Sequence, residues 1–375
     1  MNEINKQRAL KGRHMKPLFK YILLLIFAGF LSSCSNTPKP DKLSLSVRNN
    51  LNYLQENPQF VMYLNFKNMN STEFWKANIS DSVLNAEKTF GSLLNTFKQA
   101  TGVSISTGLD ELYYANSWEG ENSIVLKGLF DKNRLNTFLA TDSTFKKSVY
   151  ADGTAVYSKT DNGLYFFFKD DYTICASNYL KQIDEMMAVK DTTTSRLRKN
   201  KPMMEAIEKI IYKDNIWMVS TERTFIRGVF QNFIESTNTV PGGSSGNLML
   251  DSLKPNDSTA QKKNNANENL IADIDKIYKD AKSMSFSILM NKDLTFLIQT
   301  EFNEQQYSDY FKSIVNGIIS FSKINSSIQG NNKSSTDKIL DNTTITSVDK
   351  TVLVEMKVNS DNIQAFRQNS VLSPK

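Results

Sequence analysis

Strand and helix patterns follow one another in the same order twice along this chain, and this repetition constrains the fold more than any other feature. Apolar residues that alternate with polar ones indicate strands, and apolar residues spaced three or four positions apart indicate helices. In the first copy these patterns predict strands over 59–66, 112–118, 123–130, 148–150, 154–159, 164–169 and 172–176, and helices over 73–100, 132–140 and 178–189. In the second copy they predict strands over 216–220, 283–290, 294–302, 343–348 and 351–358, and helices after Pro202 and over 224–235, 270–279, 305–321 and 361–366.

The shared order predicts an α+β fold, with two related halves of antiparallel sheet and packed helices. We expect the first half over residues 44–200 and the second over 201–375. Residues 236–267 are rich in Ser, Asn, Gly and Lys and are expected to form a flexible insert in the second half. One continuous α+β domain without duplication is the alternative. Asp152-Gly153 supports the strand assignments, because Asp-Gly favours the tight turn of a hairpin.

An apolar run, Tyr21–Leu31, lies between basic residues and a cysteine near the N-terminus. A basic segment, a short apolar core and small residues before a cleavage point are features of a secretory signal. The run is shorter than the about 20 residues that a membrane-spanning helix needs. Leu31-Ser-Ser-Cys34 resembles the bacterial lipobox, whose cysteine is lipidated and becomes the mature N-terminus. We expect a lipoprotein signal peptide over 1–33, lipidation of Cys34 and an extended tether over 34–43; a short membrane anchor or a buried helix is the alternative.

Most of the excess of basic over acidic residues lies in the first 33 residues. The net charge is +6, but residues 1–33 carry six basic side chains against one acid, which leaves +1 for the mature chain. No basic stripe with interleaved aromatic residues follows, so the sequence gives no reason to expect nucleic acid as a partner.

Histidine usage excludes several kinds of chemistry. The only histidine, His14, lies in the predicted signal peptide. The mature chain could not use Ser-His-Asp or Cys-His catalysis, and it could not bind a metal through histidine. Cys175, the only cysteine besides Cys34, lies in an apolar alternation and is expected to be a buried strand residue. We expect no cofactor and no metal.

Short motifs of known enzymes occur in unsuitable places. Gly242–Gly246 matches the G-x-S-x-G pattern of serine hydrolases, but it lies in the insert of a chain without a histidine partner. Ser360-Asp-Asn362 matches an element of penicillin-binding enzymes, but no K-T-G follows it. Paired carboxylates, as in glycoside hydrolases, remain the one catalytic option. The candidate pairs, expected at turns or exposed helix faces, are Asp110/Glu111, Glu119/Glu121, Asp170/Asp171 and Asp273/Asp275.

Asp followed by Ser or Thr recurs more often than composition predicts. The hydroxyl residues concerned are Ser82, Ser143, Thr192, Ser252 and Ser258. The pattern resembles the O-glycosylation signal of exported Bacteroidota proteins, which makes these five residues glycosylation candidates. Helix caps and turns are the equally weighted alternative, because Asp and Ser side chains bond to nearby backbone there.

Several segments resemble a group of uncharacterised Bacteroidota lipoproteins. They are Cys34, the strand Phe60–Asn65, the Gly-Leu-Phe-Asp at 128–131 and Tyr150–Tyr157. The resemblance implies a two-half α+β lipoprotein but supplies no catalytic residue. It also implies sorting to the outer membrane, because Ser35 and Asn36 replace the Asp that retains many lipoproteins at the inner membrane.

These observations lead us to expect a lipid-anchored, non-enzymatic binding or scaffold protein of the cell envelope. The tether carries two lysines against one acid rather than the acidic run typical of surface-exported lipoproteins, which favours the periplasmic face of the outer membrane. The expected partners are the membrane, through the lipid, and an unknown envelope protein or glycan. A carboxylate-dependent, glycosidase-like envelope hydrolase is the alternative function.

Overall fold

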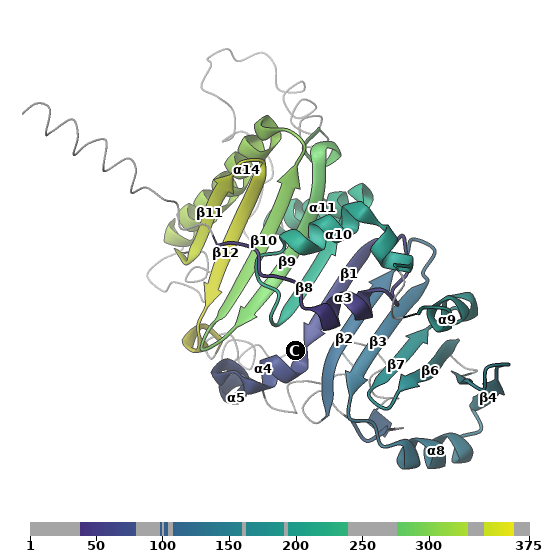
Figure 1. The fold of residues 1–375 in the computed structure, drawn as a ribbon. Coiled ribbons are helices and arrows are strands. Elements are labelled where there is room, and N and C mark those ends of the chain that lie inside the picture. Colours follow the sequence, from purple (N-terminus) through teal and green to yellow (C-terminus); the bar gives the residue numbers. More distant parts are fainter. Residues whose placement is uncertain are drawn as a thin grey trace, which may run out of the picture. The chain divides into compact units, whose positions relative to one another are not determined.

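The protein is an α+β protein with one large antiparallel sheet, as the sequence predicts. The computed structural model describes residues 38–79, 98–99, 101–103, 108–159, 163–190, 194–238, 276–328 and 341–363. The sheet has 12 strands in the order β11-β12-β10-β9-β8-β1-β2-β3-β7-β6-β5-β4 (Figure 1). Their bounds are β1 Phe60–Asn65, β2 Leu109–Asn116, β3 Asn122–Gly128, β4 Phe145–Val149, β5 Ala155–Lys159, β6 Leu164–Asp170, β7 Thr173–Ser177, β8 Ile216–Ser220, β9 Ala281–Met290, β10 Leu294–Phe302, β11 Thr343–Val348 and β12 Thr351–Val358.

The pairing of the strands has the same order on both sides of the sheet centre. β1 and β8 pair antiparallel in the middle, with Tyr63 opposite Trp217. From β1 the sheet continues through β2, β3, β7 and β6, and from β8 it continues through β9, β10, β12 and β11. The hairpin β4–β5 extends the first side only. The strands of residues 44–200 and 201–375 therefore lie in one continuous sheet with a repeated connection order.

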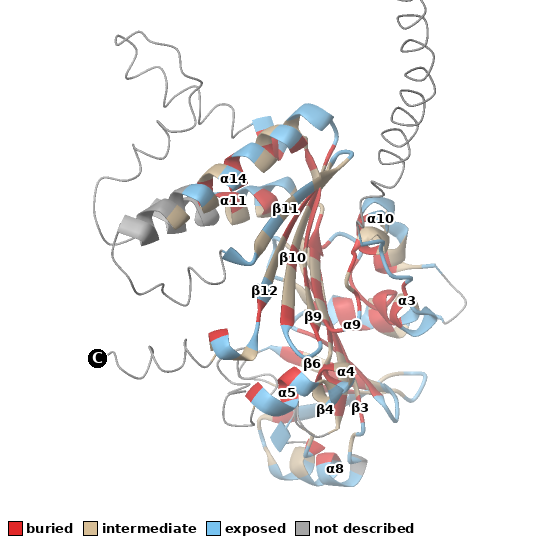
Figure 2. Ribbon diagram, turned by 90° about the vertical axis from the view of Figure 1, so that its left-hand side faces the viewer, coloured by how far each residue is buried: buried red, intermediate tan, exposed pale blue. Residues whose placement is uncertain are grey.

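Helices cover both faces of the sheet (Figure 2). On one face, here called the first face, lie α3 Leu45–Leu51, α9 Leu180–Met187, the 3-10 helix η1 Arg196–Lys199 and α10 Lys201–Lys209. On the second face lie α4 Phe66–Ser71, α5 Glu73–Asn78, α8 Lys132–Thr141, α11 Arg223–Asn238 and α14 Gln305–Ile328. The two faces hold separate apolar clusters, because alternate residues of each strand point to opposite sides.

Three predicted helices have different bounds in the structure. The helix predicted over 73–100 is described only as α5, which ends at Asn78, and most of the remainder lies outside the described residues. α11 continues to Asn238, three residues into the predicted flexible insert 236–267, and the rest of that insert is not described. α14 continues to Ile328, seven residues beyond its predicted end at 321.

A buried lysine explains why α10 ends at Lys209 although its apolar pattern continues through Ile210 and Ile211. The Lys213 ammonium group donates to the backbone oxygens of Glu208 and Ile210, which are carbonyls that the helix end leaves without partners. Burial lowers the pKa of Lys213 below its usual value. The same ammonium group also donates to the oxygen of Asp41, and the Asp41 amide donates to the oxygen of Ile211 at 3.3 Å.

These contacts hold the chain from Asp41 onward to the segment between α10 and β8. Leu43, predicted as the last residue of the tether, is buried in the core of the first face. The structure thus fixes the chain two residues before the predicted end of the 34–43 tether. Among the residues that the structure describes, no helix is both long enough and apolar enough to cross a membrane.

Gly128, the last residue of β3, lies against the backbone of the neighbouring strand segment. A Cβ atom there would stand 2.3 Å from the Gly108 oxygen and 3.1 Å from the Leu109 Cα. Because backbone atoms cannot move aside locally, we expect Gly128→Ala to lower the free energy of unfolding by roughly 2–3 kcal/mol in urea titrations. Gly228→Ala, in α11 with open space around the new Cβ, should raise it by about 1 kcal/mol. Equal small effects of both changes would contradict this prediction.

Candidate functional site

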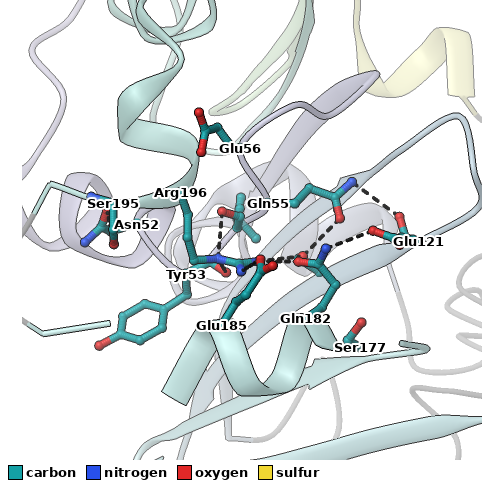
Figure 3. Close-up of polar contacts among 12 residues, drawn as sticks. Asn52, Tyr53, Gln55, Glu56, Glu121, Ser177, Gln182, Glu185, Ser195 and Arg196 are labelled. Atoms are coloured by element: carbon teal, nitrogen blue, oxygen red, sulfur yellow. Dashed lines mark hydrogen bonds and ion pairs between the residues drawn. The ribbon is translucent and has the colours of Figure 1, made fainter. Parts of the chain in front are cut away.

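The most extensive polar cluster of the described residues surrounds Arg196, at the start of η1 (Figure 3). Its side chain is 7% exposed. The Nε–H group donates to the backbone oxygens of Tyr53 at 3.0 Å and Leu54 at 3.2 Å, and the other guanidinium nitrogens donate to Gln182, Glu185 and Ser123. The planar guanidinium group thus contacts three other parts of the chain: residues 53–54, Ser123 of β3, and Gln182 and Glu185 of α9.

The backbone of Arg196 is unusual as well. Its φ angle is +51°, in the left-handed region that residues other than glycine rarely adopt. The contacts around it hold this conformation: Asn52 Oδ1 accepts from the Ser195 amide at 2.9 Å, and the Leu197 amide donates to the Leu54 oxygen at 3.1 Å. The segment 52–54 therefore serves as a template for the turn into η1.

The cluster continues toward the β2–β3 turn at residues 117–121. The Gln182 amide group donates to Glu121 Oε2 at 2.8 Å, and its oxygen accepts from Arg196 at 2.6 Å. Gln55 donates to the Glu121 backbone oxygen at 3.3 Å, and Ser123 donates to Gln55 at 3.1 Å. We call the set Gln55, Glu121, Ser123, Gln182, Glu185 and Arg196 the Arg196 cluster.

The charged groups of the Arg196 cluster are bonded to one another or to neutral partners. Burial lowers the pKa of Arg196, and the ion pair with Glu185 opposes that shift. A shallow pocket of about 280 Å³ opens beside the cluster and is lined by Glu56, Glu185, Ala188, Val189, Ser195, Arg196 and Lys199. Its carboxylates face cations: Glu185 pairs with Arg196, and Glu56 Oε2 lies 4.0 Å from Lys199 Nζ.

A second pocket, of about 210 Å³, lies at the turn that the cluster supports. It is lined by Glu119, Gly120, Glu121, Asn178 and Tyr179, none of which is basic. Asn178 joins the two loops that form it, because its Nδ2 donates to the Gly120 oxygen at 2.8 Å and its Oδ1 accepts from the Asn122 amide at 2.8 Å. The pocket is therefore built on fixed backbone.

Large apolar side chains are exposed on the same two loops. Trp118 is 57% exposed, Tyr179 48% and Leu180 42%. We call Trp118, Glu119, Glu121, Asn178, Tyr179 and Leu180 the Trp118 surface. Exposed aromatic residues on a rigid loop are a common feature of binding surfaces, since their contact area loses little conformational entropy when a partner binds.

Of the predicted carboxylate pairs, Glu119 and Glu121 both line the second pocket. Glu111, expected at a turn or an exposed helix face, instead lies within β2, which corrects that prediction. Its two oxygens accept from the hydroxyl groups of Tyr63 at 2.9 Å and Tyr113 at 2.8 Å, and Lys127 Nζ lies 3.8 Å away. Glu111 points to the first face because it alternates regularly with Tyr113 and Ala115, and a register shift between Leu109 and Glu111 places Leu109 on the second face.

Of the remaining pairs, two lie at turns as expected. Glu119 and Glu121 belong to the β2–β3 turn, and Asp170 closes the β6–β7 turn by accepting from the Tyr172 amide at 2.9 Å. Asp273 and Asp275 lie outside the described residues. No group of three or more His, Cys, Asp or Glu side chains in the described part of the chain could hold a metal ion.

Most predicted modification sites also lie outside the described residues: Cys34, Ser82, Thr192, Ser252 and Ser258. Ser143 is described and exposed, in the turn after α8. Asp142 Oδ1 accepts from the Thr144 amide at 2.9 Å and its hydroxyl at 2.7 Å, and these hydrogen bonds lower the pKa of Asp142. The turn-forming alternative therefore accounts for the Asp at this site, while glycosylation of Ser143 stays a prediction.

Cys175 is a buried residue of β7, as the sequence predicts. Burial raises the pKa of its thiol to about 12, so the thiolate form that reacts as a nucleophile is scarce at neutral pH.

The fold and the site together define an α+β protein with a large antiparallel sheet and polar side chains locked in internal contacts. No protein-family model matches the chain, and no curated protein matches it. Among solved structures, crystal form IV of TP0453 matches with a TM-score of 0.40 and 8% identity, covering 90% of this chain and 98% of that one. Crystal form I of TP0453 matches with a TM-score of 0.41 and 7% identity, covering 90% and 99%. Structural similarity at these TM-scores and identities supports no conclusion about function.

Proposed function

We propose that this protein is a lipid-anchored, non-enzymatic binding or scaffold protein of the bacterial envelope, on the periplasmic face of the outer membrane. The main observation behind the proposal is that the polar side chains of the site are bonded internally, whereas its aromatic side chains are exposed. The buried charged groups of the described site are satisfied by internal contacts, whereas Trp118 is exposed on the β2–β3 turn that the Arg196 cluster supports and Tyr179 is exposed on the adjoining β7–α9 loop. Such a surface is suited to hold a partner rather than to transform one.

The Trp118 surface has a definite character as a binding site. Glu119, Glu121 and Asn178 line its pocket together with Tyr179, and no basic side chain does. Aromatic faces and a few polar groups at fixed positions are the usual elements of ligand recognition. They suit the hydroxyl groups of a glycan or the polar surface of an envelope protein.

The tether supports a position close to the membrane. If Cys34 carries lipid, seven residue steps separate it from Asp41, where the chain is fixed to the segment between α10 and β8. At about 3.1 Å per residue for an extended, proline-containing segment, the reach is roughly 22 Å. Asp41 would then lie no further than this from the inner leaflet of the outer membrane.

The hydrolase alternative ranks second because of the hydrogen bonds of its candidate acids. A glycosidase needs one carboxylate free as a nucleophile or base and another as a general acid. Here Glu121 accepts from Gln182, Glu185 pairs with Arg196, and Glu111 accepts from two tyrosines. These acids are already engaged in the folded chain.

In-cell crosslinking with matched variants tests this proposal. We expect the double variant Trp118→Ala/Tyr179→Ala to lose at least nine-tenths of a specific crosslinked product, or of binding to isolated envelope glycan, because it removes the exposed rings. Tyr172→Ala serves as the control. Tyr172 is 59% exposed in the β6–β7 turn, at the opposite end of β7 from Tyr179. Cys34→Ala should move the protein out of the membrane fraction.

Two results would contradict the proposal. Equal crosslinking by the Trp118/Tyr179 and Tyr172 variants would remove the Trp118 surface from the binding site. Glycan cleavage by the purified protein that Glu119→Gln abolishes would establish the hydrolase instead.

A further inference from the structure

β4 forms one edge of the 12-stranded sheet (Figure 1). The Tyr150 amide, just after β4, donates to the Thr154 oxygen at 2.9 Å. Backbone groups alternate in direction along a paired strand, so those of Lys147 and Val149 point outward, away from β5. In the part of the chain that the structure describes, which includes the segments directly before and after β4, no hydrogen bond uses the outward groups of these two residues. The edge can therefore accept another strand.

The side chains along this edge make it basic. Neither β4 nor β5 contains an acidic residue, and Lys146 and Lys147 are exposed. Lys147 points to the second face, where its Nζ lies 5.9 Å from the centroid of the Tyr157 ring, and Lys146 points to the first face. Val149, at the end of the strand, is 64% exposed. The edge thus offers one positive charge on each face and an apolar contact beside them.

We infer that β4 binds an extended acidic segment of another protein, which joins the sheet as an antiparallel strand. Main-chain hydrogen bonds supply the affinity of an added strand, and side chains at alternate positions supply its specificity. One residue of the segment would exchange both backbone hydrogen bonds with Lys147, and the next would lie opposite Lys146. The pattern recognised is therefore an apolar residue opposite Val149, any residue opposite Ser148, and then two acids.

A second copy of this chain would fit the edge poorly. Antiparallel pairing of two β4 strands centred on Lys147 would set that lysine against itself, and like charges directly opposite each other are destabilising. A carboxylate at the same position forms an ion pair instead. The charge that disfavours a second copy therefore selects an acidic strand.

Binding of a fluorescent peptide to the full-length protein in detergent, measured by anisotropy, tests this inference. The peptide has the core Val-Thr-Glu-Glu-Val, whose first Glu lies opposite Lys147 in the proposed register. We expect the wild-type chain to bind it about tenfold or more tightly than the same peptide with Lys in place of both Glu residues. Lys146→Glu/Lys147→Glu should reverse this preference. Lys67→Glu/Lys76→Glu, at exposed positions of α4 and α5, changes the net charge equally and should leave the preference as it is.

Methylation of peptide nitrogens distinguishes strand pairing from simple charge attraction. The amide of the first Glu would donate to the Lys147 oxygen, so methylating it should weaken binding about tenfold. The amide of the second Glu would point away from β4, so methylating it should leave the affinity nearly unchanged.

Three results would overturn the inference. The first is a wild-type chain that does not prefer the acidic peptide, and the second is an equal loss of preference in both double variants. The third is an equal effect of the two methylations. If the β4 variant binds neither peptide, the methylated peptides on the wild-type chain decide the outcome, because they leave the protein unchanged.

Discussion

Replacing Arg196 by methionine is expected to lower the free energy of unfolding by about 2–4 kcal/mol. Methionine keeps much of the length of the side chain but donates no hydrogen bond. The oxygens of Tyr53, Leu54 and Gln182 would then lack their buried donor, and each unsatisfied buried acceptor costs about 1–3 kcal/mol. The left-handed backbone at residue 196 would keep the hydrogen bonds of its neighbours to Asn52 and Leu54 but lose the anchoring by the guanidinium group.

Urea unfolding followed by circular dichroism measures this loss, and Glu185→Gln provides the matched control. Glu185 is the ion-pair partner of Arg196, but its side chain is 43% exposed. Water can solvate the groups that lose their ion-pair partner, so Glu185→Gln should lower the free energy of unfolding by less than about 1 kcal/mol. A loss below about 1 kcal/mol for Arg196→Met, or equal losses for both variants, would show that the Arg196 cluster does not support the fold.

The strands were predictable because their signal is local. Alternation over a few residues, bounded by turn residues, identified β1, β8, β10, β11 and β12 within one residue or so of their observed ends. The hairpin β4–β5 follows from Asp152-Gly153, where Gly153 adopts φ +84°. Glycine accommodates that angle without a steric penalty, so the sequence and the backbone agree.

The Arg196 cluster could not be predicted, because its contacts are distant in sequence. Arg196 begins the run Arg-Leu-Arg-Lys-Asn-Lys, which by composition alone reads as a solvated, charged segment. Its acceptors at Tyr53 and Leu54 lie 143 and 142 positions earlier in the chain. Arg196 becomes buried only when the folded sheet brings these segments together, and no local sequence pattern indicates that contact.

Glu111 was misplaced for a related reason. Asp110 and Glu111 form an acidic pair just before an apolar strand pattern, which is typical of a turn. In the structure a β-bulge extends β2 through both residues, and the Tyr63 and Tyr113 hydroxyl groups satisfy the Glu111 carboxylate. The tyrosine on β1 that makes this burial possible pairs with Tyr113 across the strands, so it could be identified only after the register was known.

Three buried, weakly acidic side chains, those of Tyr63, Tyr113 and Cys175, predict a steep loss of stability at alkaline pH. Burial, and next the Glu111 carboxylate, raise the pKa values of the Tyr63 and Tyr113 phenols above their ordinary value of 10.0. Burial raises the pKa of the Cys175 thiol from 9.0 to about 12. In the unfolded chain these groups ionise at their ordinary values, whereas in the folded chain they stay protonated to higher pH.

The sign of the effect follows from proton binding. Where the folded state holds more protons than the unfolded state, stability falls as the pH rises. The contribution of Cys175 is complete below pH 9.0 and is lost up to about pH 12, and the contributions of the two tyrosines begin to fall above pH 10.0. Each group costs about 1.4 kcal/mol per pH unit, so all three together cost about 4 kcal/mol per unit. Lys213 acts in the opposite direction, because burial lowers its pKa, but its effect is complete by pH 10.5.

We therefore expect cooperative unfolding above about pH 11, since a loss of about 5 kcal/mol by that pH approaches the total stability of an ordinary domain. Tyrosinate absorbance and circular dichroism, recorded on the same samples, should change together at one pH. Tyr172→Phe removes a phenol that is 59% exposed and should leave the midpoint unchanged. Cys175→Ala should delay the onset of the loss from pH 9 to pH 10, because the tyrosines alone then titrate. If every tyrosine ionises gradually near pH 10 while the circular dichroism stays native, then the phenols of Tyr63 and Tyr113 are not held protonated by the core.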